Sequence, residues 1–128
     1  MIKLNIHSIQ LPNQPPEIYY GNKEYKISLD YPDNYFNLSK ILEKKASQLL
    51  FRLNEGDGKA IYFIGVEDNG ISKGIHINKL FISLYHLLKM SEIIGSMISK
   101  INIYKGNTGF IATIRLFTQL NNNYLLYI

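Results

Sequence analysis

Three carboxylates are the residues of this chain whose types and spacing could support metal-dependent chemistry. Glu67 and Asp68 follow an apolar run, Ala60 to Val66, and precede the turn signal Asn69-Gly70. Glu24 lies on an earlier segment whose alternating apolar residues predict a strand. Carboxylates that converge in space hold Mg²⁺ in nucleases. The alternative is a solvated turn in which Asp68 accepts from neighbouring backbone N–H groups, so the sequence leaves the role of these carboxylates open.

A second candidate surface is basic. Lys40, Lys44, Lys45 and Arg52 fall on a predicted helix, and a basic helix face can contact the phosphates of a nucleic acid. Glu43 interrupts the set, which makes an ordinary solvated face the competing interpretation. The whole chain carries 14 Lys and Arg against 10 Asp and Glu, a net charge of +4. This charge permits contact with RNA without requiring it.

Motifs for nucleotide binding and nucleophilic catalysis are incomplete. The phosphate loop G-x-x-x-x-G-K-[ST] fails at Gly58-Lys59, because Ala60 follows and Leu53 occupies the first glycine position. Ser72 matches G-x-S-x-G, but it falls in a predicted hairpin arm with no His and Asp placed to serve it. The chain has no cysteine and only three scattered histidines. We therefore predict no catalytic residue, no metal site and no cofactor in this chain.

The order of the predicted elements describes one α+β domain. Alternating or continuous apolar runs predict strands, and apolar steps of three and four predict helices. Two amphipathic helices packed on one face of a mixed sheet of about five to seven strands satisfy this pattern. The predicted strands are at about 1–9, 22–31, 60–66, 71–77, 97–104 and 110–118, with a short one at 124–128, and the helices at 36–53 and 79–94.

Local signals predict details around the carboxylates and the second helix. Asn69-Gly70 predicts a tight type I′ turn, with residues 71–77 returning as the hairpin partner of the buried strand before it. Asn78 is the predicted N-cap of the second helix. Because that helix carries few charges, we expect it to be buried over more than one stripe.

The N-terminal segment is predicted to be distinct from the rest. Pro12, Pro15 and Pro16 indicate an extended linker, so residues 1–20 form an N-terminal strand and linker and residues 21–128 the α+β domain. The first residues do not have the pattern of a signal peptide. No apolar run approaches the ~20 residues of a membrane span. We expect a cytoplasmic protein without membrane contact.

Residues from Gly21 to Gly74 resemble a known family. The chain reads EYK at Glu24–Lys26, RLNEGDGKAIY at Arg52–Tyr62 and GVEDNG at Gly65–Gly70. These blocks are similar to E-Y-K, R-L-x-E-G-x-G-x-A-x-Y and G-V-E-D-N-G in the elongation-factor-like GTPases called GTP-binding proteins one and two, in the region before their G domain. The second predicted helix and the strand at 100–104 fall where that family has its next helix and strand.

The resemblance implies an N-terminal accessory or interaction domain of a translational GTP-binding protein. The GTPase domain is absent from this chain, so GTP and Mg²⁺ belong to the implied parent protein. The expected partner is the parent's G domain, with the ribosome or RNA as further candidates. The oligomeric state stays open.

A weaker similarity links the chain to the AlbA-like domains of Schlafen proteins, which show E-[FY]-K and I-G-V-x-D-x-G. In the nuclease members, two glutamates and a hairpin aspartate form the site. Glu24 and Asp68 match two of these positions, but Tyr19 stands where the other glutamate is needed. This similarity implies the alternative function, a small nucleic-acid-binding or RNA-cleaving domain.

Overall fold

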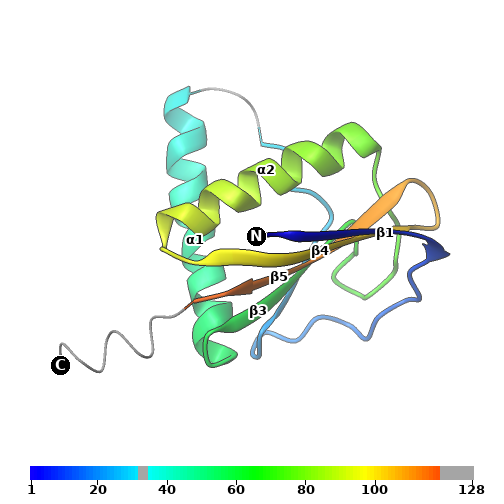
Figure 1. Ribbon diagram of the computed structural model, residues 1–128, viewed down its shortest axis with the longest axis horizontal. Helices are drawn as coiled ribbons and strands as arrows, with labels where there is room; N and C mark the ends of the chain where they lie inside the picture. Colours follow the sequence, from blue (N-terminus) through cyan, green and yellow to red (C-terminus); the bar gives the residue numbers. More distant parts are fainter. Residues whose placement is uncertain (32–34, 119–128) are drawn as a thin grey trace.

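The computed structural model describes residues 1–31 and 35–118. These residues form a five-stranded mixed sheet with two helices packed on one face (Figure 1). The predicted α+β class is confirmed, with five strands. The predicted strand at 124–128 lies outside the described residues. The elements are β1 (Lys3–Gln10), β2 (Lys23–Lys26), α1 (Tyr35–Glu55), β3 (Lys59–Ile64), α2 (Ile77–Ile93), β4 (Met97–Lys105) and β5 (Phe110–Phe117).

The strand order across the sheet is β1-β4-β5-β3-β2. The two outer pairs, β1 with β4 and β2 with β3, are parallel, whereas β5 is antiparallel to both of its neighbours. β1 thus joins the same sheet as the strands that follow it, although it comes from the segment predicted to be distinct. The boundary at residue 20 stays a prediction.

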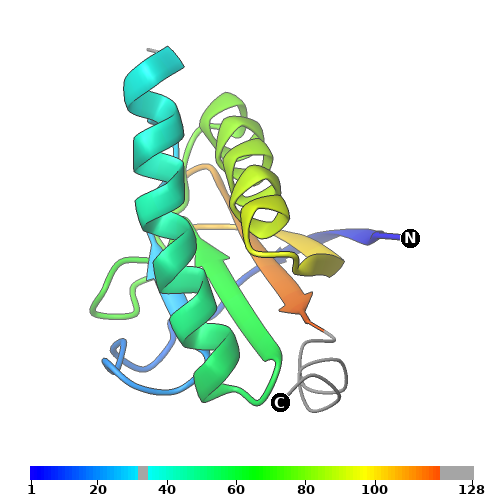
Figure 2. The same cartoon turned by 90° about the vertical axis from the view of Figure 1, so that its left-hand side faces the viewer.

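Two apolar clusters lie on opposite faces of the sheet. The larger fills the space between the sheet and the helices and includes Leu49, Tyr62 and Ile114, each 0% exposed. The smaller one, on the other face, joins Leu11 to Phe63 and its neighbours. Figures 1 and 2 show both helices over one side of the sheet, while the segment between β1 and β2 crosses the other side. The Pro-rich linker therefore covers part of the face that the helices leave open.

The predicted hairpin after β3 is wrong. Gly70 N–H bonds the Glu67 carbonyl at 2.8 Å, which closes a turn. Among the described residues other than glycine, Asp57 alone has a positive φ, so Asn69 does not form a type I′ turn. No strand returns from this turn within the described chain. Both edges of β3 are already occupied, by β2 and β5, and the loop forms only an isolated bridge from Ile75 to Phe110.

Helix α2 also departs from the sequence prediction. It begins at Ile77, and its N-cap is His76, whose Nδ1 accepts from the Asn78 N–H at 3.1 Å. The helix buries two pairs of consecutive residues, 86–87 and 90–91, together with Leu80 and Ser83. Consecutive residues lie about 100° apart around a helix, so burial over more than one stripe is confirmed, although Phe81 and Tyr85 are 55% and 56% exposed. Among the described helices, none has the length and apolarity needed to cross a bilayer.

Candidate functional site

The predicted carboxylate Glu24 is the partner of the predicted surface cation Arg52. Glu24 on β2 is 6% exposed and Arg52 on α1 is 4% exposed. Arg52 Nε donates to Glu24 Oε1 at 2.9 Å. Arg52 therefore does not belong to a solvated basic face. It lies beside Leu53 on the inner side of α1, where its long side chain reaches β2.

The Arg52 guanidinium also holds the end of the linker that precedes β2. Nη1 donates to the carbonyls of Tyr20 and Gly21, both at 2.9 Å, and Nη2 donates to the Ile18 carbonyl at 3.2 Å. A planar guanidinium has five donors in a fixed arrangement, which suits several acceptors in one turn of chain. Arg52 thus fixes residues 18–24 on α1, and its role here is structural.

Glu17 is a half-buried carboxylate that the sequence did not single out. Its carboxylate accepts from the Tyr25 backbone N–H on the outer edge of β2, and its Oε2 lies 4.0 Å from Arg52 Nη2. Burial raises the pKa of Glu17, and the nearby Glu24 adds to the rise, while the Tyr25 N–H and Arg52 oppose it. Glu17 lies in the Pro-rich linker, where no periodic pattern marks it.

Glu17→Gln is expected to change how stability depends on pH. The folded carboxyl holds its proton above the ordinary value of 4.5, so folding takes up a proton in that window. The stability that the protonated Glu17 carboxyl contributes is present at low pH, and it is lost as the pH rises through the raised pKa. Urea unfolding from pH 4.5 to neutral pH should show the variant gaining stability relative to wild type. Glu43→Gln, an exposed change on α1, is the control, and a pH-independent difference for Glu17→Gln would contradict the assignment.

The remaining predicted carboxylates do not complete a metal site. Asp68 is exposed and Glu67 is half-buried. Asp68 lines a hollow of about 480 Å³ together with Glu17, Glu24, Lys26 and Arg52. Lys26 Nζ lies 3.5 Å from Glu24 Oε2, so two cations neutralise Glu24. In the part of the chain that the structure describes, no three His, Asp or Glu residues are grouped to hold a metal ion.

The other residues of the predicted basic surface lie on α1. Lys40 and Lys44 are exposed, and Lys45 is half-buried. Their contact with a nucleic acid stays a prediction. Ser72 is fully buried, and its hydroxyl donates to the Pro12 carbonyl at 2.8 Å. This environment is that of a structural serine.

The sheet face opposite the helices, which we call the open face, collects cations that the sequence analysis did not group. The register aligns Lys3 with Lys100, Lys100 with Arg115, Arg115 with Ile61, and Ile61 with Lys23. Cross-strand partners share a face and stand side by side. One row across all five strands therefore holds four cations, which we call the basic row: Lys3, Lys100, Arg115 and Lys23.

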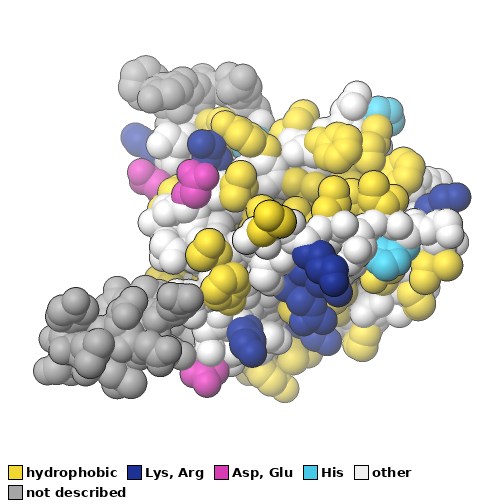
Figure 3. Space-filling view, viewed as in Figure 1, with side chains coloured by type: hydrophobic (Ala, Val, Ile, Leu, Met, Phe, Trp, Pro, Cys, Tyr) yellow, Lys and Arg dark blue, Asp and Glu magenta, His cyan; other side chains and the backbone are white. Residues whose placement is uncertain are grey.

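Polar and aromatic side chains form the next rows of the open face. Asn5 aligns with Asn102, and Asn102 with Thr113. Asn102 Oδ1 accepts from His7 Nε2 at 3.0 Å. The His7 ring stacks on Tyr104, with 4.5 Å between ring centroids and 8° between planes. Figure 3 shows Lys and Arg side chains gathered near a histidine on this side of the molecule.

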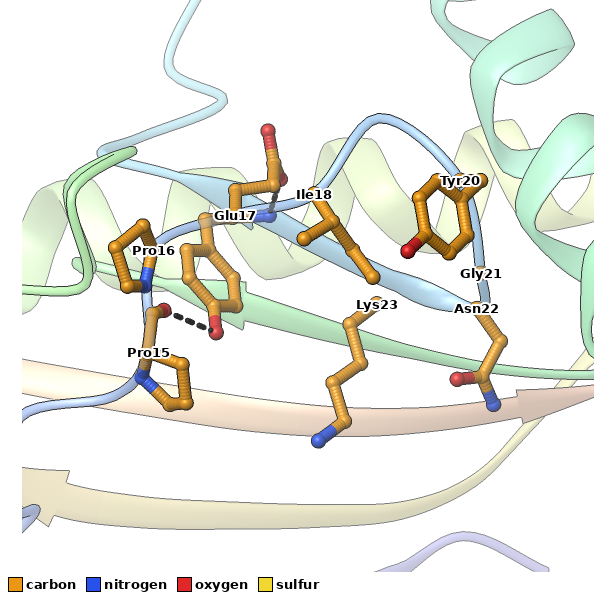
Figure 4. Close-up of a pocket in the computed structure, with 9 residues that line it drawn as sticks. Pro15, Pro16, Glu17, Ile18, Tyr20, Gly21, Asn22 and Lys23 are labelled. Carbon is orange, nitrogen blue, oxygen red and sulfur yellow. Dashed lines mark hydrogen bonds between the residues drawn. The ribbon is translucent and has the colours of Figure 1, made fainter.

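Two hollows adjoin the basic row. One, of about 420 Å³, is lined by Lys59, Ile61, Arg115 and Phe117 among others. The other, of about 250 Å³, lies between the linker and β2. In Figure 4 the Lys23 side chain extends past this second hollow, and the Pro15 carbonyl accepts from the Tyr25 hydroxyl at 2.9 Å. Asn22 lines both hollows, so the two adjoin the same end of β2.

The alternation of Lys3, Asn5 and His7 was the sequence signal for this face. A period of two predicts that these side chains share a face of a strand. It does not predict which strand is the neighbour, because the residues of β4 lie 97 positions away in register. The basic row could therefore be identified only from the strand order and the register of the sheet.

Comparison with known proteins gives two relatives. The chain is 41% identical over 88 residues, 69% of its length, to GTP-binding protein 2 of Homo sapiens and equally to that of Mus musculus. It spans only 14% of the length of these relatives. No protein-family model and no solved structure matches it. The predicted resemblance is confirmed: the chain is related to one segment of GTP-binding protein 2.

Proposed function

We propose that this relative of GTP-binding protein 2 is an N-terminal accessory domain of a translational GTP-binding protein. The observation that carries the proposal is the 41% identity over 88 residues, matched to 14% of a much longer protein named for GTP binding. The chain's own residues lack a complete phosphate loop. We infer that GTP and Mg²⁺ are bound by another part of the parent protein and that this domain contacts its G domain.

The carboxylate hollow supports an interaction domain over an RNA-cleaving one. A nuclease carboxylate must be available to a metal ion. Glu24 instead accepts from Arg52 at 2.9 Å and lies 3.5 Å from Lys26. The cations therefore occupy the position that a metal ion would need, and the ion pair serves the fold.

A binding experiment tests the proposed function. Human GTP-binding protein 2 lacking its own copy of this segment is titrated with the chain in the presence of GTP and then of GDP. We expect saturable binding, and we expect the chain alone to bind no fluorescent GTP analogue. The intact human protein is the control, because its own segment should occupy the same surface and reduce binding. Nucleotide binding by the chain alone, or failure to bind the truncated protein, would contradict the proposal.

A further inference from the structure

We propose that the open face of the sheet binds single-stranded RNA, with phosphates along the basic row and bases on the rows beside it. The charge pattern, the side-chain types and the hollows on this face carry the inference. Binding of a single-stranded nucleic acid follows from the structure alone. The choice of RNA over DNA rests on the proposed translational function.

The distribution of acidic residues separates the two faces of the sheet. In the described chain, acidic side chains form ion pairs with Lys26, Arg52, Lys79 and Lys89. These four cations lie on the helices or on the helix-covered side of the sheet. None of these ion pairs involves a cation of the basic row. The strands contain one acidic residue, Glu24, and it faces the helices together with Tyr62. In the described chain, the cations of the basic row are therefore not held in these ion pairs, an arrangement that favours an external anion.

The spacing of the row suits a linear polyanion. Neighbouring strands lie about 4.8 Å apart, so a row across five strands spans roughly 19 Å. Lys3, Arg115 and Lys23 are exposed and Lys100 is half-buried. A nucleic-acid backbone crossing the strands would place successive phosphates along these cations. Electrostatic contacts of this kind give most of the affinity of sequence-independent binding.

The rows beside the cations suit unpaired bases. The half-buried His7 and Tyr104 offer stacked rings, and aromatic side chains are the usual platforms on which unpaired bases stack. The half-buried Asn5 and Thr113 supply hydrogen-bonding groups for base edges or ribose hydroxyls. Asn102 between them is only 9% exposed and holds the His7 ring through its Oδ1. The 420 Å³ hollow next to Arg115 and Phe117 adds an apolar wall.

The half-buried rings and the amide row of the open face favour a single strand over a duplex. In an RNA duplex the bases are stacked on each other, and proteins contact mainly its phosphates and shallow groove. A duplex would leave the His7–Tyr104 pair and the amide row unused. The linker covers the smaller apolar cluster around Phe63 and Ile111 and leaves the basic row open. The bound RNA strand is therefore confined to the uncovered end of the open face.

Fluorescence anisotropy with a labelled single-stranded RNA of about 12 nucleotides tests the proposal. Four phosphate contacts on a single strand predict a slope of about −2.8 for log K against log salt, or about 50-fold weaker binding at 200 mM than at 50 mM salt. Lys100→Gln with Arg115→Gln should halve the slope and weaken binding about 25-fold at 100 mM salt. Lys3→Gln with Lys23→Gln repeats the test at the two ends of the row. Thermal unfolding confirms that each variant is folded.

The matched comparison is Lys40→Gln with Lys44→Gln, which removes the same charge from the exposed face of α1, the competing basic surface that the sequence predicts. Its binding should stay within about twofold of wild type, and an equal loss would overturn the assignment to the open face. Binding without salt dependence, or tighter binding to duplex RNA, would also overturn the proposal. Equal affinity for single-stranded DNA of the same sequence would overturn the choice of RNA as the ligand. RNA binding without binding to the truncated GTP-binding protein 2 would leave this surface standing while the proposed function fails.

Discussion

Replacing Arg52 with alanine is expected to lower the free energy of unfolding by about 3–5 kcal/mol, because removing one partner of a buried ion pair leaves the other charge uncompensated. Arg52 and Glu24 are 4% and 6% exposed, with 2.9 Å between Nε and Oε1. The substitution also removes the donors to the carbonyls of Tyr20, Gly21 and Ile18. Lys26, whose Nζ lies 3.5 Å from Glu24, compensates only part of the charge.

Urea unfolding measures this loss, and two companion variants identify its cause. Arg52→Lys keeps the charge but cannot reproduce the planar set of guanidinium donors. Its free energy of unfolding should therefore lie between those of wild type and Arg52→Ala. Arg52→Met with Glu24→Gln removes both charges, and it should recover much of the stability that alanine loses. A loss under 1 kcal/mol for Arg52→Ala would match an exposed cation instead. It would contradict the buried ion pair.

The placement of Arg52 shows what periodicity can and cannot predict. The steps of three and four predicted α1 and its inner stripe, including Leu49 and Leu53, and both are buried. Position 52 lies at the border of that stripe, where a cation is ordinarily exposed. Its burial depends on Glu24, which precedes it by 28 residues, and no local pattern relates the two. The helix could be predicted from the sequence, but its role as the support of β2 could not.

The wrong hairpin and the basic row have the same physical origin. Asn69-Gly70 favours a turn, and a turn does form, but the partner of a strand is decided by competition for its edges. β2 and β5 take both edges of β3. In the same way, Lys3, Lys100 and Arg115 become neighbours through strand pairing between distant segments. Local signals predicted most elements here, whereas the candidate site depends on nonlocal register.

Gly74→Ala is the second substitution with a large expected effect, a loss of about 2–4 kcal/mol. Gly74 has φ +86, a backbone conformation that L side chains rarely adopt. A Cβ there would lie 1.8 Å from the Thr108 carbonyl oxygen. That oxygen belongs to the backbone of the β4–β5 turn, so relief of the clash requires moving one loop away from the other.

The two loops are joined by the hydrogen bonds that such a movement would break. Thr108 N–H donates to the Lys73 carbonyl at 2.9 Å, and Asn107 N–H donates to the Ser72 carbonyl at 2.8 Å. Gly74 N–H donates to the Gly65 carbonyl, also at 2.8 Å. The loop that follows β3 is thereby fixed on the β4–β5 turn, which explains how it stays ordered without a hairpin partner.

Gly95→Ala separates the effect of the clash from that of the backbone conformation. Gly95 also has a positive φ, +71, but a Cβ there meets nothing within 4 Å. Its replacement should therefore cost only the strain of the left-handed conformation, about 1 kcal/mol. Urea unfolding of both variants gives the difference directly. Equal losses would mean that the two loops separate freely, and the close packing of Gly74 against Thr108 would then contribute nothing to stability.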